Sequence, residues 1–204
     1  KAADKLSKLG MEVGEVSIPA HHSAMAIYRG SIYEGAAALL RAHGLGYHWY
    51  GFYQTSLAET LGRSLKAQAN DLPPELKLTM LLGTYLSEYY HGRLYAKAQN
   101  LRPSLRASYD SALKEFDVLA MPTVPMRAVK NEPGMDWKTR MESISEQGDN
   151  CSPFNATGHP AISIPCAKVD GLPVGLMLVA RHFNDALLLK VAHAFEQHVD
   201  WQTL

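Results

Sequence analysis

Residues 153–165 have the sequence PFNATGHPAISIP, and residues 171–179 have the sequence GLPVGLMLV. The apolar ends of these stretches, 162–164 and 176–179, predict two strands, and Asp170-Gly171 between them is a strong signal for a β-hairpin turn. Ahead of the first strand, Asn155, Thr157 and Gly158 place short polar side chains and exposed backbone at the edge of the predicted sheet, where open α/β sheets commonly bind ligands. Composition alone favours a simpler interpretation, a tight turn in which Asn and Gly supply positive φ angles.

Around this hairpin, apolar residues at helical spacing alternate with short apolar runs, which predicts an α/β protein. We expect helices over residues 2–9, 23–42, 74–100, 103–116 and 185–199, and strands over residues 11–18 and 117–122. Gly10 is typical of a helix end, Pro73 and Pro74 of a helix start, and Asn184 of an N-cap. Residues 46–52 and 127–134 predict irregular loops.

Composition argues against several classes of function. The 204 residues carry 20 basic and 20 acidic side chains, so net charge gives no reason to expect binding to nucleic acid or to an anionic membrane. The longest apolar runs are too short to span a bilayer, and residues 1–6 lack the apolar stretch of a secretory signal. With two cysteines, Cys151 and Cys166, we expect no disulfide framework and a cytoplasmic location.

No residue pattern predicts a nucleophile, a metal site or a cofactor site. Cys151 and His159 are too far apart in sequence to specify contact, so structural roles are the simpler interpretation. His21 and His22 are adjacent and lack a ligand three or four residues away, so no metal is predicted. Ser163 alternates with apolar residues in a predicted strand and lacks an elbow motif. The run from residue 44 to 46 is not a phosphate loop, and no cofactor is expected.

Three ordered blocks resemble the C-terminal core of the amidase-signature family, hydrolases that cut carbon–nitrogen bonds. The first block contains Gly83, Tyr85, Tyr95, Ala98, Gln99 and Arg102, followed by FDVL at 116–119 and PTVP at 122–125. The second is the stretch 154–165, and the third joins residues 171–176 to Leu189, Ala192 and Glu196. Residues 34–41 resemble the acidic, alanine-rich helix of the same family. The resemblance therefore covers most of the chain.

This resemblance implies a fold and a mechanism. The fold is an α/β/α architecture, a mixed sheet covered by helices, in which residues 1–204 would form the C-terminal part of a single domain. In the mechanism, a neutral lysine takes a proton through a bridging serine, a second serine attacks the amide carbonyl, and water then frees the acid. No Gly-rich run with paired serines occurs here, so no catalytic residue carries over. The Ser-Ser-Lys triad is expected on a missing N-terminal half.

The resemblance also implies which residues shape the substrate pocket, because one loop lies beside the catalytic cavity in similar proteins. The candidates on that loop are Asn150, Phe154, Asn155, Thr157 and Gly158. Thr123, which follows a predicted strand, and Tyr28, on an upstream helix, are further candidates, although core packing would explain Tyr28 equally well.

We therefore expect an amidase that converts small carboxamides to an acid and ammonia or an amine, with this chain supplying scaffold and pocket wall. Two alternatives stay open: the glutaminase subunit of a tRNA-dependent amidotransferase, and an amidase-like binding module without an active site. The expected partners are a small-molecule amide, the missing N-terminal half and, from the family alone, a second copy in a homodimer. Nucleic acid and membrane are not expected partners.

Overall fold

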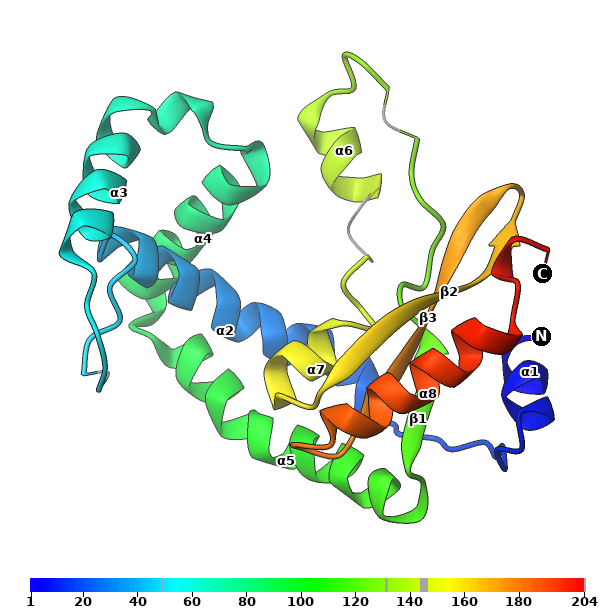
Figure 1. The fold of residues 1–204 in the computed structure, drawn as a ribbon. Helices are drawn as coiled ribbons and strands as arrows, with labels where there is room; N and C mark the ends of the chain where they lie inside the picture. The colour runs from blue at the N-terminus through cyan, green and yellow to red at the C-terminus, as the bar shows by residue number, and fades with distance from the viewer. Residues whose placement is uncertain (49, 131, 144–146, 204) are drawn as a thin grey trace. The chain divides into compact units, whose positions relative to one another are not determined.

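The computed structural model describes residues 1–48, 50–130, 132–143 and 147–203, and the chain divides into two compact units (Figure 1). Unit 1 comprises Lys1–Tyr28 and Leu101–Leu204, and unit 2 comprises Arg29–Asn100. The α-helices are α1 (Ala2–Lys8), α2 (His21–Arg41), α3 (Thr55–Ala67), α4 (Pro74–Tyr90), α5 (Arg93–Glu115), α6 (Trp137–Ser143), α7 (Ser152–Thr157) and α8 (Asp185–His198). The strands are β1 (Val118–Pro122), β2 (Ala161–Val169) and β3 (Leu172–Ala180), and the short 3-10 helices are η1 (Ala69–Asp71) and η2 (Trp201–Thr203). None of the described helices is long and apolar enough to cross a membrane.

A three-stranded sheet in the order β1-β3-β2 lies at the centre of unit 1. Both strand pairs are antiparallel, and β2 and β3 form a hairpin. Its turn residues, Asp170 and Gly171, have φ angles of 49° and 79°, both positive as the favoured two-residue hairpin turn requires. The hairpin predicted from these two residues is therefore confirmed. The pairing register shifts between Pro165 and Ala167, which places a bulge in β2.

Helices cover both faces of this sheet. Successive side chains of β3 point to opposite faces, so neighbouring residues of β3 belong to different cores. Leu178 belongs to a core with Phe195 of α8. Val179 belongs to a second core, which it shares with Leu113 of α5 and Phe154 of α7. Unit 1 thus has helix, sheet and helix layers, with α8 packed on β2 and β3 and with α5 and α7 contributing to the other core (Figure 1).

Unit 2 is helical, and its helices approach closely at two positions, Gly83 and Glu34. At Gly83 of α4 there is no room for a side chain, because a Cβ there would overlap the backbone carbonyl group of Tyr33 in α2. The buried carboxylate of Glu34 in α2 accepts a hydrogen bond of 2.8 Å from the backbone N–H of Tyr95, in the first turn of α5. The hydroxyl of Ser87 in α4 donates to the same carboxylate at 3.4 Å. These contacts join α2, α4 and the beginning of α5.

Two predicted elements are wrong. Residues 11–18 form no strand, and Val13 and Val16 are 48% and 45% exposed, so their alternation buries no apolar face in the described structure. The helix predicted over residues 74–100 ends at Tyr90, because His91 adopts the left-handed conformation and ends α4. The next helix, α5, begins at Arg93 and continues through Pro103 rather than starting there.

Three helices, α3, α6 and α7, are absent from the predictions. The tight turn favoured by composition at residues 153–158 is instead the short helix α7, with Pro153 in its first turn and Gly158, at φ 78°, as its C-cap. The loops predicted at 46–52 and 127–134 are irregular over their described residues, and residues 49 and 131 lie outside them.

Candidate functional site

Polar side chains from distant parts of unit 1 meet where β1 ends. We call Thr123, Asn150 and Ser163 the polar edge. Thr123 follows β1 directly, and its Oγ1 atom lies 2.6 Å from the Ser163 Oγ atom on β2, within hydrogen-bond distance. The Asn150 Nδ2 group, close before α7, donates a hydrogen bond of 2.8 Å to the carbonyl oxygen of Pro122. Two of the predicted pocket residues, Thr123 and Asn150, therefore lie at the same end of the sheet.

The two hydroxyls can meet because the middle strand carries Gly175 between them. The backbone N–H of Thr123 donates a hydrogen bond of 2.9 Å to the carbonyl oxygen of Gly175. A Cβ on Gly175 would lie 2.6 Å from Thr123 Oγ1 and 2.7 Å from Ser163 Oγ. Both distances are too short for a real contact, so any larger residue would push the hydroxyls away.

Replacing Gly175 by alanine should therefore displace the hydroxyl pair and lower the free energy of unfolding by about 1–3 kcal/mol, the usual cost of over-filling a packed site. Chemical denaturation of the native protein measures this change. In a double-mutant cycle, Ser163→Ala removes one of the two obstructing hydroxyls and should recover part of the loss. If the two substitutions were strictly additive, crowding of Ser163 would not be the reason for the glycine.

A chain of hydrogen bonds connects Asn150 to the core. The His21 Nε2 atom lies 3.2 Å from Asn150 Oδ1, and the His21 Nδ1 atom lies 2.8 Å from the Tyr109 hydroxyl. Because Asn150 Oδ1 can only accept, the Nε2–H of His21 donates to it, and a neutral His21 then accepts the Tyr109 proton at Nδ1. Burial raises the pKa of Tyr109 above its ordinary value, so the phenol keeps this proton. The chain fixes the orientation of the Asn150 amide.

Phe154 and Cys151 help to hold α7 in place. The Phe154 ring meets the Tyr109 ring edge-on, with centroids 5.0 Å apart, and both side chains are buried. The thiol of Cys151 lies 3.3 Å from the carbonyl oxygen of Thr123, and burial raises the pKa of this thiol. A protonated, hydrogen-bonded thiol agrees with the structural role expected for Cys151. Phe154 is a core residue in this arrangement.

A second polar group lies at the other end of α7. His159 Nδ1 is 2.8 Å from Thr157 Oγ1, and His159 Nε2 is 3.2 Å from Asp110 Oδ1 on α5. Both ring nitrogens of His159 thus have partners other than Cys151. Burial lowers the pKa of His159, and the hydrogen bond with Asp110 opposes this shift. Gly158, with its positive φ angle, turns the chain from α7 towards His159.

The predicted pocket residues therefore fall into several places. Thr123 and Asn150 belong to the polar edge, Thr157 and Gly158 lie beside His159, and Phe154 is in the core. Asn155 is exposed on α7, and Tyr28 is half-buried on α2, outside the two polar groups described above. The role of these seven residues in a pocket stays a prediction.

Sequence reasoning missed most of the residues that build these two groups. They are His21, Tyr109, Asp110, Gly175 and His182, the last of which lies against His159. They come from separate elements, so no spacing motif connects them. One usable signal existed: Gly175 directly precedes the predicted strand 176–179, and a glycine in a strand often marks a site where other groups approach closely.

A cavity of about 470 Å³ lies in unit 2 and contains none of the seven predicted residues in its lining. Glu34, Ser87 and Tyr95 contribute to its wall, together with small and apolar residues of α2. The Glu34 carboxylate is already engaged by Ser87 and by the backbone of Tyr95, which gives it a clear structural role.

Comparison with known proteins places these observations in a family. The model of the Amidase family matches residues 1–189. The chain belongs to the amidase family. This membership confirms the resemblance seen in the sequence, and the proteins of the family are amide hydrolases.

Two relatives of this amidase-family chain differ in length. It is 38% identical over 164 residues to "Uncharacterized protein in nthA 5'region" of Rhodococcus erythropolis, covering 80% of this chain and 82% of that protein. It is 34% identical over 201 residues to the A subunit of glutamyl-tRNA(Gln) amidotransferase from Clostridium kluyveri (strain NBRC 12016), covering 98% of this chain. The chain spans only 40% of the length of that Clostridium protein.

Solved structures confirm the predicted fold class. A crystal structure of an amidase superposes with a TM-score of 0.69 at 24% identity, over 97% of this chain and 40% of that one. The structure of 6-aminohexanoate cyclic dimer hydrolase complexed with substrate superposes with a TM-score of 0.70 at 22% identity, over 98% and 40% of the two chains. The predicted mixed sheet would contain parallel as well as antiparallel strand pairs. In the described residues of unit 1, all strand pairs are antiparallel.

Proposed function

We propose that this chain is the C-terminal part of an amide hydrolase and supplies the scaffold and one wall of its substrate pocket. The observation that carries the proposal is the family match over residues 1–189 in a chain that spans 40% of a related amidotransferase protein. In the proposed reaction, a serine outside these 204 residues attacks the carbonyl of a small carboxamide. Ammonia or an amine leaves, and water then frees the acid.

Two features of unit 1 support the proposal that a further polypeptide segment packs against it. Among the described strands, β1 pairs with β3 on one side only, so its other edge has no strand partner. The extended segment 11–18 exposes nearly half of Val13 and of Val16. Unpaired strand edges and exposed apolar side chains are typical of surfaces that another segment covers. Both features agree with catalytic residues on polypeptide outside this chain.

The polar edge is our candidate for the part of unit 1 that contacts the substrate. Thr123 and Asn150 lie at the end of a strand and carry groups that can form hydrogen bonds with an amide. Asn155 is exposed on α7, while Phe154 on the same helix packs against Tyr109 in the core. A helix held from the inside by an aromatic pair gives the exposed positions a fixed placement, which a pocket wall requires.

A second candidate function rests on the relatives. Besides the Clostridium protein, the A subunit of glutamyl-tRNA(Gln) amidotransferase from Geobacillus thermodenitrificans (strain NG80-2) is 36% identical over 204 residues. On this alternative, the amide that is hydrolysed is the side chain of glutamine. A third candidate, a binding module without catalysis, is supported by the Rhodococcus relative, because this chain spans 82% of that protein.

Ammonia release separates these candidates. The native protein should release ammonia from small carboxamides, and the 204-residue chain produced alone should release none. Preference for glutamine over simple carboxamides would favour the amidotransferase function, and no release from either substrate by the native protein would favour the binding module. Measurable turnover by the isolated chain would contradict our placement of the catalytic residues.

Replacing Asn155 by phenylalanine should change the relative rates on small and large amides. Because Asn155 is exposed, the larger side chain should leave folding intact while narrowing the proposed pocket. We expect the ratio of kcat/KM for a long acyl amide to that for a short one to fall by about tenfold, the usual scale of discrimination by pocket size. The control is Leu189→Phe, at a 62% exposed position of α8. An unchanged ratio for Asn155→Phe would remove Asn155 from the pocket.

A further inference from the structure

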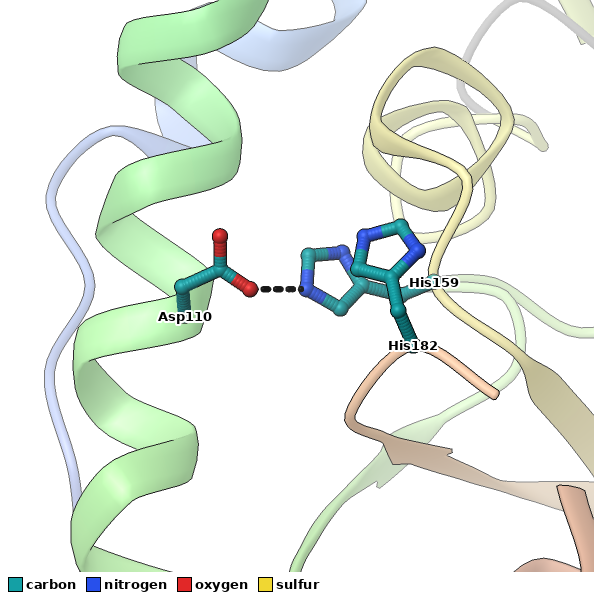
Figure 2. A group of neighbouring side chains, drawn as sticks. All are labelled: Asp110, His159 and His182. Carbon is teal, nitrogen blue, oxygen red and sulfur yellow. Dashed lines mark hydrogen bonds and ion pairs between the residues drawn. The ribbon is translucent and has the colours of Figure 1, made fainter. Parts of the chain in front are cut away.

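Asp110, His159 and His182 converge in unit 1 from three separate parts of the fold (Figure 2). Asp110 lies on α5, His159 lies between α7 and β2, and His182 follows β3. One possible ligand atom from each side chain lies within 4.8 Å of those of the other two. We propose that these three residues form a binding site for a divalent transition-metal ion and that Zn²⁺ fits this site best.

The spacing of the His159–Asp110 pair suits a metal. His159 Nε2 and Asp110 Oδ1 are 3.2 Å apart. In a tetrahedral zinc site with bonds of about 2.0–2.1 Å, neighbouring ligand atoms are about 3.3 Å apart, so this pair already has the separation of two ligands. The possible ligand atoms of all three residues lie within 4.8 Å of one another, so binding of one ion requires His182 to come closer to the other two. Two imidazoles and one carboxylate are ordinary ligands for zinc.

The remaining nitrogen of His159 is oriented as metal-binding histidines usually are. Histidine ligands typically donate their second ring N–H to a fixed acceptor, which sets the tautomer and the direction of the ring. Here His159 Nδ1 lies 2.8 Å from the hydroxyl of the buried Thr157. Without a metal, Nε2–H donates to Asp110; when a metal takes the place of this proton, Nδ1–H can donate to Thr157 and Nε2 supplies the lone pair that the metal needs.

His182 supplies an independent observation. Its Nε2 atom is buried and has no hydrogen-bond partner among the described residues. Its ring packs against the His159 ring, with centroids 4.3 Å apart, as Figure 2 illustrates. A buried nitrogen without a partner is unfavourable, and coordination to a metal is one way to satisfy it. A histidine pair stacked only for packing would leave this cost uncompensated.

Charge and access are both compatible with a bound cation. The Asp110 side chain is 42% exposed, which leaves a route from solvent, while the His159 side chain is fully buried. Arg106 Nε lies 3.6 Å from Asp110 Oδ2, so it contacts the carboxylate oxygen that does not face His159. Arg106 keeps Asp110 oriented, but its positive charge also weakens attraction for the metal. We therefore expect a single, moderately tight site.

The proposed role is structural. A bound ion would connect α5, the start of β2 and the end of β3, which are far apart in sequence. Three protein ligands leave a further position for water in a tetrahedral shell. Ligand binding to the folded state alone stabilises it, so the ion should raise the melting temperature of the protein.

Calorimetric titration of the metal-free native protein with Zn²⁺ tests the proposal. We expect one equivalent to bind, and at least a tenfold loss of affinity in His182→Ala and in Asp110→Asn. The matched control is His193→Ala, which removes an exposed histidine of α8 and should bind as the parent does. Bound Co²⁺ supplies a second measurement, because low-symmetry four-coordinate sites absorb visible light far more strongly than six-coordinate ones.

Melting temperatures measured with and without Zn²⁺ show whether a variant has lost the metal site or has failed to fold. Each variant should melt cooperatively without metal, and Zn²⁺ should raise the melting temperature of the parent and of His193→Ala only. Equal Zn²⁺ affinity in the parent and in His182→Ala would overturn the proposal, as would the absence of binding to the parent. In either case the three side chains would be a hydrogen-bonded pair with a stacked histidine and no metal site.

Discussion

Replacing Tyr109 by alanine should lower the free energy of unfolding by about 3–5 kcal/mol, the usual cost of removing a large aromatic side chain from a core. Tyr109 has no exposed surface, and its ring lies edge-on to both Phe154 and His159. Its hydroxyl also supports His21. The substitution removes packing between α5 and α7 and ends the hydrogen-bond chain to Asn150 in one step. Urea denaturation followed by circular dichroism measures the loss.

The matched control is Tyr109→Phe, which keeps the ring and removes only the hydroxyl. We expect this variant to lose about 1 kcal/mol, because His21 loses one hydrogen bond while the core stays filled. If the two variants lost equal stability, the hydroxyl and not the ring would dominate, and the aromatic packing of α7 would be unimportant. A cost near zero for both would contradict the buried position of Tyr109.

Replacing Gly83 by alanine should lower the free energy of unfolding by about 3 kcal/mol, at the upper end of the usual cost of over-packing. A Cβ at this position would overlap the carbonyl group of Tyr33 and lie 2.7 Å from Ala37 Cβ. These neighbours belong to the backbone and the first side-chain atom of α2, so neither can rotate away. The helices α2 and α4 must therefore move apart, and thermal or urea unfolding of the native protein should report it.

Gly35→Ala is the control for this experiment. Gly35 also lies within a helix, α2, but a Cβ there would meet only the Tyr95 ring, at an ordinary contact distance of 3.5 Å. Alanine should therefore stabilise α2 by about 0.5–1 kcal/mol through its higher helix propensity. If Gly83→Ala gave the same gain, the close approach of α2 and α4 would not exist in solution.

Local signals in the sequence predicted the elements whose structure depends on nearby residues. Asp170-Gly171 predicted the β2–β3 hairpin, because the turn itself requires two positive φ angles. The apolar spacing of Leu188, Ala192 and Phe195 predicted α8, and all three are buried. The strand predicted over residues 11–18 was wrong, because a strand depends on residues that are distant in sequence. A strand needs a partner, and alternation within one segment does not show whether a partner is present in the described structure.

The candidate sites could be predicted only in part. Thr123 and Asn150 were found through the family resemblance, and the structure places both at the end of β1. His21 was considered only for metal binding next to His22, whereas its real partners, Asn150 and Tyr109, are 129 and 88 positions away. Asp110 and His182 gave no signal at all, because ligands brought together by tertiary packing have no fixed spacing in sequence.

The two-residue turn between β2 and β3 also bears on how unit 1 folds. Closing so short a loop costs little conformational entropy, whereas pairing β1 with β3 must first close a loop of roughly fifty residues. Because contacts between residues near in sequence form fastest, the hairpin should form early and β1 should join it late. Until β1 joins, a newly made chain would expose the edge of β3 that later pairs with β1. At this stage of folding, the exposed edge could pair wrongly with a strand of another chain.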